Sequence, residues 1–185
     1  MMPELSLNVL DVAQNSVRAE ASLIEISVLA DTVKDKLTIQ IRDNGCGMTA
    51  EQAAHVEDPF FTTRTTRKVG LGVPFFKLAA ESTGGSFSID TAPGAGTTVT
   101  AVFGLSHIDR MPLGDMTSTI HTLITMNEQI DFLYLYQVDG RSFTLDTREF
   151  RQILGDVSFQ EPEISAYIKE YLAENEQETR QGIAI

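Results

Sequence analysis

A carboxylate and an amide stand one helical turn apart near the N-terminus of this 185-residue chain, at Asp11 and Asn15. Apolar residues recur at helical spacing around them and predict a helix over residues 4–18, with both side chains on one face. Carboxylate and amide oxygens suit Mg²⁺ or a bound water. Taken alone, the pair is better explained by a solvated polar stripe on the helix surface.

A glycine-punctuated loop, Asp43-Asn-Gly-Cys-Gly-Met48, follows two alternating segments, 23–29 and 37–42, which predict a β-hairpin. Glycines let the backbone approach a ligand closely and adopt positive φ. A buried aspartate in such a loop could accept a hydrogen bond from an exocyclic amine such as that of adenine. An ordinary turn with a capping aspartate explains the same residues equally well.

A third segment runs from Asp58-Pro-Phe-Phe-Thr-Thr-Arg64 through Lys68 to Gly70-Leu-Gly72, where a helix over residues 74–82 is predicted to follow. Free N–H groups and the positive dipole end at a helix N-terminus suit a polyphosphate. An exposed loop is the alternative, because a lone Gly-x-Gly is a weak signal. A fourth segment, Gly94-Ala-Gly-Thr-Thr98, forms a turn between predicted strands 86–91 and 97–103.

These segments, in this order, resemble the ATP-binding fold shared by gyrase-type topoisomerases, heat-shock chaperones, histidine kinases and MutL proteins, the GHKL or Bergerat superfamily. The resemblance covers residues 5 to about 104. The spacing around Asn15 and Asp43 is closer to MutL, whereas the later motifs are closer to histidine kinases. The motifs are an N box at residues 11–15, a G1 box at 43–47, an F box at 59–61, a G2 box at 70–72 and a last box at 94–98.

The resemblance implies a site for ATP and Mg²⁺. Asn15 would coordinate the Mg²⁺ that bridges the phosphates, Asp43 would bind the adenine amino group, and residues 62–69 would form a lid with basic side chains near the γ-phosphate. In the register typical of histidine kinases, Asn8 and Val12 would form the pair instead, with Val12 at the magnesium position. The distance from this helix to the following strand favours the register that places Asn15 there. The implied nucleotide-binding residues are Asn15, Asp43, Gly45, Gly47, Phe60, Arg64, Lys68, Gly70, Leu71, Gly72, Thr97 and Thr98.

Two residues depart from the family pattern. Asp11 stands where many relatives carry a Glu that activates water or an acceptor hydroxyl, and its side chain is one methylene shorter, which limits its reach as a catalytic base. Lys68 stands where the first glycine of the G2 box is usual, which bears on lid closure more than on nucleotide binding.

Three functions follow as hypotheses. The first is a kinase-like protein that transfers phosphate to, or regulates, a separate partner protein, as the anti-sigma serine kinases do. We expect no phosphoacceptor helix pair before residue 5, and we interpret His55 as a surface or packing residue. The second is an ATP-driven conformational switch or weak ATPase, and the third is a nucleotide-free interaction domain.

The amino-acid composition limits the classes of binding partner and site that this chain can have. The formal net charge of −12 argues against binding to nucleic acid or to an anionic membrane, which would also count against a DNA-repair role. The single cysteine excludes a disulfide framework, and the three histidines lack metal-site spacing. No apolar run is long enough to span a bilayer and no signal peptide is evident, so we expect a cytoplasmic protein.

The predicted fold is α+β, a two-layer α/β sandwich of the histidine-kinase and gyrase type over residues 1–104, with a small C-terminal α/β appendage over 105–185. The appendage carries a net charge of −8 from 6 basic and 14 acidic residues. Asp139-Gly140 predicts a hairpin, flanked by helices at 116–128, 147–154 and 162–174. We expect the last ten residues to fray and the appendage to serve as a partner or homodimer surface.

Overall fold

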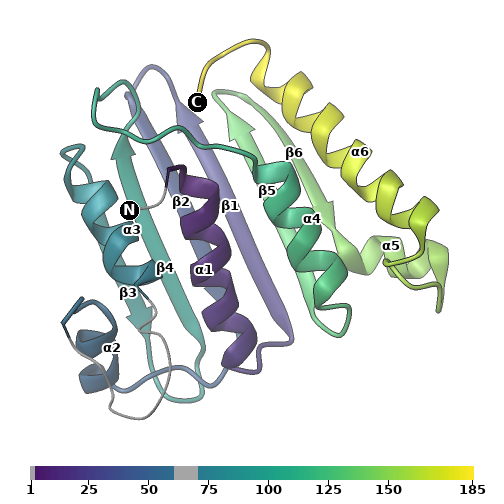
Figure 1. Ribbon diagram of the computed structural model, residues 1–185, viewed down its shortest axis with the longest axis horizontal. Helices are drawn as coiled ribbons and strands as arrows, with labels where there is room; N and C mark the ends of the chain where they lie inside the picture. The colour runs from purple at the N-terminus through teal and green to yellow at the C-terminus, as the bar shows by residue number, and fades with distance from the viewer. Residues whose placement is uncertain (1–2, 61–70) are drawn as a thin grey trace.

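The computed structural model describes residues 3–60 and 71–185. One sheet of six strands is accompanied by six helices in this part of the chain (Figure 1). In chain order the elements are α1 (Leu5–Arg18), β1 (Leu23–Asp31), β2 (Lys36–Asp43), α2 (Ala50–Val56), α3 (Gly72–Glu81), β3 (Ser86–Thr91), β4 (Thr97–Gly104), α4 (Met116–Met126), β5 (Asp131–Val138), β6 (Arg141–Asp146), α5 (Thr147–Leu154) and α6 (Pro162–Arg180).

The sheet has the strand order β3-β4-β2-β1-β5-β6. β1 and β5 are parallel, and the other neighbouring strands are antiparallel. Short turns suffice between antiparallel neighbours, whereas a parallel pair needs a crossover connection. Both predicted hairpins, β1–β2 and β5–β6, are present. Residues 105–185 therefore extend the same sheet by two strands, and their separate functional role stays a prediction.

Alternation along the strands separates a covered face from an open one. Ile24, Ile26 and Val28 of β1 are fully or almost fully buried, and the residues between them are only partly buried. Figure 1 shows α1, α3, α4 and α6 over one face of the sheet. The predicted two-layer sandwich is therefore confirmed, with the core between the helices and this face.

Helix α1 lies between α3 and α4 and is anchored at its N-terminus (Figure 1). The N–H of Leu5 donates to the carbonyl of Pro112 at 3.0 Å, and that of Ser6 donates to Leu113 at 2.8 Å. The first turn of a helix has unpaired N–H groups, and these carbonyls satisfy two of them. The segment that enters α4 thus fixes the helix that carries Asp11 and Asn15.

The N-termini of α2 and α3 differ in how their first turns are capped. Thr49 forms a full capping box with Gln52 at the start of α2. Helix α3 begins at Gly72, two residues before the predicted start, and no side chain caps it at Leu71. Proline at position 74 fits because the first turn needs no N–H from that residue.

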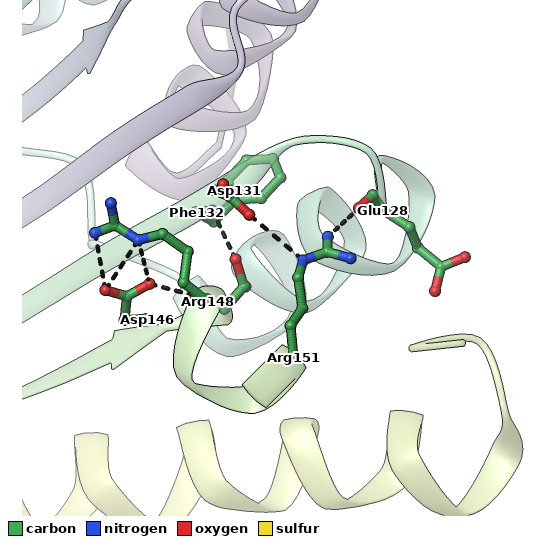
Figure 2. Close-up of polar contacts among 7 residues, drawn as sticks. Glu128, Asp131, Phe132, Asp146, Arg148 and Arg151 are labelled. Carbon is green, nitrogen blue, oxygen red and sulfur yellow. Dashed lines mark hydrogen bonds and ion pairs between the residues drawn. The ribbon is translucent and has the colours of Figure 1, made fainter. Parts of the chain in front are cut away.

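Helix α5 is fixed to β5 and β6 by polar contacts shown in Figure 2. Asp146 accepts hydrogen bonds from the backbone N–H of Arg148 at 3.0 Å and from its guanidinium at 2.8–3.2 Å. The Thr147 hydroxyl accepts from the N–H of Phe132 at 2.9 Å. Arg151 contacts Asp131 at 3.4 Å and the carbonyl of Glu128. The helix bounds match the prediction for 147–154.

The expected fraying of the last ten residues is wrong in this structure. α6 continues to Arg180, six residues beyond its predicted end, and Glu176 and Thr179 are buried against the rest of the molecule. The carbonyl of Ile185 accepts a hydrogen bond from the N–H of Leu113. Specific packing partners thus order a polar end. In the described ranges, no helix has the length and apolar character required to cross a membrane.

Candidate nucleotide-binding site

A cavity of about 200 Å³ opens between α1, α3, the loop after β2 and strand β4. Its wall is mainly apolar and includes a few polar side chains, as is usual for a small-molecule site. The lining residues are Val12, Asn15, Ser16, Ala19, Asp43, Cys46, Gly47, Met48, Val56, Val73, Ile89, Thr97 and Val99.

Asp43 is the carboxylate of this cavity and is held by two donors. Its side chain lies at the end of β2 and the residue is 8% exposed. The hydroxyl of Ser16 donates to Oδ2 at 2.6 Å, and the N–H of Gly45 donates to Oδ1 at 2.9 Å. Each carboxylate oxygen can accept more than one hydrogen bond. Asp43 is therefore a fixed hydrogen-bond acceptor in the wall of the cavity.

The loop after Asp43 depends on glycine at position 47. Gly47 has φ +68°, and a Cβ there would lie 1.9 Å from the carbonyl oxygen of Ala92. The loop is also joined to the 92–96 turn by a bond from the N–H of Gly94 to the carbonyl of Cys46 at 2.7 Å. Gly47 thus lets two backbone segments meet behind the cavity.

Asn15 lies on the cavity wall, and Asp11 lies one turn earlier in α1, exposed. Asp11 contacts the start of α3, because a Cβ on Gly72 would lie 2.7 Å from the Cβ of Asp11. Asn15 and Asp11 thus lie one turn apart on α1, and Asp11 is beside the first turn of α3, which has no side-chain cap at Leu71.

The amide oxygen of Asn15 and the carboxylate of Asp11 fit a Mg²⁺ ion that is held mainly by phosphate oxygens. Beside a polyphosphate, this ion typically takes only one or two protein ligands. Among residues 3–60 and 71–185, no three His, Cys, Asp or Glu side chains cluster in a way that could hold a metal ion. A metal site built from protein ligands alone is thus not found in that part of the chain.

The two candidate asparagines of α1 differ sharply in environment. Asn8 is completely buried, and neither polar atom of its side chain has a hydrogen-bond partner among the described residues. Asn15 reaches the cavity, and Val12 contributes an apolar wall to it. Asn15, rather than Asn8, therefore lies in the wall of the cavity.

The two candidate threonines lie on opposite faces of β4. Thr97 lines the cavity, and its hydroxyl lies 2.9 Å from that of Thr91. Thr98 is the next residue of the strand, so its side chain points to the open face. The structure brings Thr97, but not Thr98, to the site.

The remaining candidates divide by position. Leu71 and Gly72 stand at the start of α3, and Phe60 is 90% exposed. Arg64, Lys68 and Gly70 lie outside the described residues.

Two residues that contact the site, Ser16 and Arg18, were not among the residues predicted from the motifs. Ser16 fixes Asp43, as described above, and Arg18 donates from Nη1 to Oδ1 of Asn15 at 3.1 Å. The contact between Arg18 and Asn15 could have been predicted, because residues three apart on a helix are neighbours on its surface. No local signal exists for the other contact, because Ser16 and Asp43 come from different elements.

The chain is similar in sequence to sensor proteins. The family described as "Histidine kinase-, DNA gyrase B-, and HSP90-like ATPase" matches residues 3–107, more than half of the chain. A "Putative sensor protein" of Shewanella frigidimarina is 30% identical over 102 residues, covering 54% of this chain and 16% of that protein. A "Probable C4-dicarboxylate sensor kinase" of Bacillus subtilis is 32% identical over 88 residues, covering 48% and 16%. The chain thus spans about a sixth of the length of these relatives.

Solved structures share the fold. The Aquifex aeolicus MutL ATPase domain, solved with ADP, has a TM-score of 0.53 at 14% identity and covers 83% of this chain and 70% of its own. The N-terminal domain of a DNA repair protein gives a TM-score of 0.53 at 17% identity, covering 78% and 52%. The match to the MutL domain covers 83% of this chain, whereas residues 1–104 make up only about 56% of it (104 of 185). The structural likeness therefore extends beyond residue 104. The chain belongs to the histidine kinase-, DNA gyrase B- and HSP90-like ATPase family.

Proposed function

We propose that this chain binds Mg-ATP in the cavity beside Asp43 and transfers phosphate to, or regulates, a separate partner protein. The observation that carries the proposal is the carboxylate of Asp43, which Ser16 and Gly45 hold against an apolar cavity. A fixed acceptor in an apolar slot suits the exocyclic amine of adenine. The sensor-kinase relatives support a role in signal transduction.

The phosphates would extend from this slot toward Asn15 and the start of α3. Asn15 would offer its side-chain oxygen to Mg²⁺, and the free N–H groups of α3 would face the phosphates. Bound Mg²⁺ would neutralise charge on the phosphate oxygens. Arg64 and Lys68 would add positive charge, and Gly70, Leu71 and Gly72 would let the backbone follow the nucleotide. Thr97 would support the adenine side.

Asp11 is the proposed catalytic base of this reaction. Its exposed carboxylate lies against the first residue of α3, at the end of the site where the γ-phosphate would stand. We infer that an acceptor hydroxyl or imidazole of the partner approaches this end. His55 is a poor acceptor candidate, because it belongs to α2, pairs with Glu51 at 3.6 Å, and is not part of the cavity wall.

An ATP-driven switch is the second candidate, and the anchoring of α1 favours it. The helix that carries Asp11 and Asn15 is hydrogen-bonded to residues 112–113, and the hydroxyl of Thr119 in α4 donates to the carbonyl of Ser6 at 3.3 Å. A shift of α1 on binding Mg-ATP would thus reach α4 directly. In either case, residues 105–185 are the proposed partner or homodimer surface, and the cytoplasm, where ATP is supplied, is the proposed location.

Calorimetric titration with Mg-ATP is the first test, with Asn15→Ala as the variant and Arg42→Gln, on the open face, as the matched control. We expect binding by the parent and by the control, and a loss of at least tenfold in affinity for Asn15→Ala. No binding of ATP or ADP by the parent protein would favour a nucleotide-free interaction domain instead.

An assay with ATP labelled at the γ-phosphate then distinguishes phosphate transfer to a partner from ATP hydrolysis. Label appearing on a partner Ser, Thr or His supports the transferase. Phosphate release without labelled protein, abolished by Asn15→Ala, supports the ATPase or switch. A chain that binds ATP and yields neither product is a binding switch without chemistry.

A further inference from the structure

Glu176 of α6 is a buried carboxyl that lies outside the nucleotide cavity. The residue is 7% exposed, and Figure 1 shows α6 lying next to α4 over the strands β5 and β6. The hydroxyl of Thr117 in α4 donates to Oε2 at 3.1 Å, and that of Tyr134 in β5 donates to Oε1 at 3.1 Å. One carboxyl group therefore joins three elements.

The charged and titratable groups around this carboxyl come from every packed element. Tyr134 and Tyr136 lie on β5, Asp115 caps α4, and Arg180 follows one turn later on α6 and donates to the Tyr136 hydroxyl at 3.2–3.3 Å. On β6, Arg141 donates to the carbonyl of Thr179 at 2.9 Å rather than to Glu176.

Burial is the largest influence on the pKa of Glu176 and raises it from 4.5 to about 7. The hydroxyls of Thr117 and Tyr134 oppose the rise by stabilising the carboxylate, and so does Arg180, whereas Asp115 adds to the rise. No basic group forms an ion pair with Glu176 among the described residues. The ionised form is therefore incompletely compensated in the docked helix.

We propose that Glu176, with Thr117 and Tyr134, forms a proton-linked latch that fastens α6 to α4 and β5 when the carboxyl is protonated and loosens when it ionises. The hydroxyl partners suit both states, because each can donate to a carboxylate and accept from a carboxylic acid. Opening of α6 hydrates the carboxylate, so ionisation favours the open form.

The latch is connected to the helix that carries Asn15 through residues 112–113. The N–H of Leu113 donates to the carbonyl of Ile185 after α6, and the carbonyl of Leu113 accepts from Ser6 in α1. Loosening of α6 would therefore release one of the contacts that hold the 112–113 segment against α1. The docked state of this acidic helix would respond to pH over the range in which most cells operate.

The sign of the pH dependence follows from the two pKa values. A carboxyl with a pKa of about 7 in the docked helix and 4.5 when hydrated stabilises docking fully below 4.5 and loses that stabilisation as pH rises to about 7. The opening equilibrium should rise tenfold per pH unit in this window, by up to about 300-fold, and level off above it.

Hydrogen exchange of the α6 amides between pH 5 and 8, corrected for intrinsic rates, measures this equilibrium. We expect protection of residues 172–180 to fall as pH rises in the parent. Glu176→Gln should be flat with pH and more protected than the parent at pH 8, because the amide mimics the protonated form. Glu174→Gln, which removes the same charge from an exposed position of α6, should behave like the parent.

A second titratable contact of α6 requires its own control. The Nε2 of His121 in α4 lies 2.8 Å from the Ser165 hydroxyl and 3.0 Å from its carbonyl. In His121→Gln the pH dependence at residues 172–180 should persist. Its disappearance there would assign the effect to His121 and overturn the proposal.

Titration of the Glu176 side-chain carboxyl by carbon NMR gives a readout in the unmodified chain. A midpoint near 7 supports the latch, and a midpoint near 4.5 overturns it. Equal protection of Glu176→Gln and the parent at pH 8 would also overturn it. Neither measurement involves nucleotide, so the outcome is independent of the proposed function.

Discussion

The Ser16 hydroxyl donates a 2.6 Å hydrogen bond to Asp43, which ties the middle of α1 to the end of β2 across 27 residues of sequence. Gly45 occupies the other carboxylate oxygen from within the loop. The carboxylate of Asp43 is therefore oriented before any ligand arrives, and in the proposed complex a nucleotide base would meet an acceptor that needs no rearrangement. Preorganisation of this kind lowers the entropic cost of binding.

Removal of either member of this pair should weaken ATP binding to different extents. Asp43→Asn replaces an acceptor oxygen by an NH₂ donor facing the adenine amine, and we expect affinity to fall by about 100-fold. Ser16→Ala leaves the acceptor but frees its orientation, and we expect about a tenfold loss. Calorimetric titration measures both, with Asp90→Asn on exposed β3 as control. Unchanged affinity in Asp43→Asn would place the base elsewhere.

Gly47 and Gly94 offer a matched pair for the loop behind the cavity. Both have positive φ, +68° and +76°, so alanine costs about 1–2 kcal/mol of backbone strain at either position. Only at Gly47 would the new Cβ strike backbone, 1.9 Å from the Ala92 oxygen, whereas nothing lies within 4 Å at Gly94. Urea unfolding should therefore show a loss of more than about 3 kcal/mol for Gly47→Ala and only the strain cost for Gly94→Ala. Equal losses would contradict the close approach.

The Nη1 of Arg18 lies 3.1 Å from Oδ1 of Asn15, so Arg18 would compete with the proposed Mg²⁺ for this oxygen. In the presence of Mg-ATP, we expect the guanidinium to turn toward the phosphates, which compete for it as stronger acceptors. Arg18→Gln should weaken Mg-ATP binding by roughly tenfold and leave AMP binding unchanged. Competition titrations with the two nucleotides measure the difference. An equal effect on AMP would mean that Arg18 acts on the fold rather than on the phosphates.

Local patterns predicted most elements of this fold. Helical periodicity marks α1, and Asp-Gly marks the β5–β6 turn. The end of α6 lacked such a signal, since Glu176 and Thr179 are polar by type yet buried by partners distant in sequence. Pairing of β5 with β1 is equally nonlocal and follows from no single motif.

The candidate site shows the same division. Asn15, Asp43 and Gly47 could be named because the motifs place polar groups and glycines at loop and helix positions, and all three line the cavity. The choice between Thr97 and Thr98 depended on strand register, which decides the face to which each side chain points. Contacts between elements, such as Ser16 with Asp43, needed the assembled structure.

Acid should weaken the anchor of α5 through Asp146. The guanidinium of Arg148 is the main cause that lowers the pKa of this carboxyl below 3.8, and the backbone N–H of Arg148 lowers it further, while burial acts in the opposite direction. A lowered pKa in the folded state means that the stabilisation is complete above 3.8 and is lost as pH falls below that value. Figure 2 shows both contacts of Asp146 with Arg148.

Two substitutions separate the cap of α5 from its ion pair. Asp146→Ala removes both contacts and should lower the free energy of unfolding by about 1–2 kcal/mol at pH 7, whereas Asp146→Asn keeps the cap and should cost about 0.5 kcal/mol. Because the parent loses the charge of Asp146 in acid, the difference between parent and Asp146→Asn in urea unfolding should shrink between pH 7 and a pH below 3.8. Arg148→Gln should reproduce the Asn result at pH 7. A cost for Asp146→Asn that is the same at both pH values would show that packing, rather than charge, holds α5 in place.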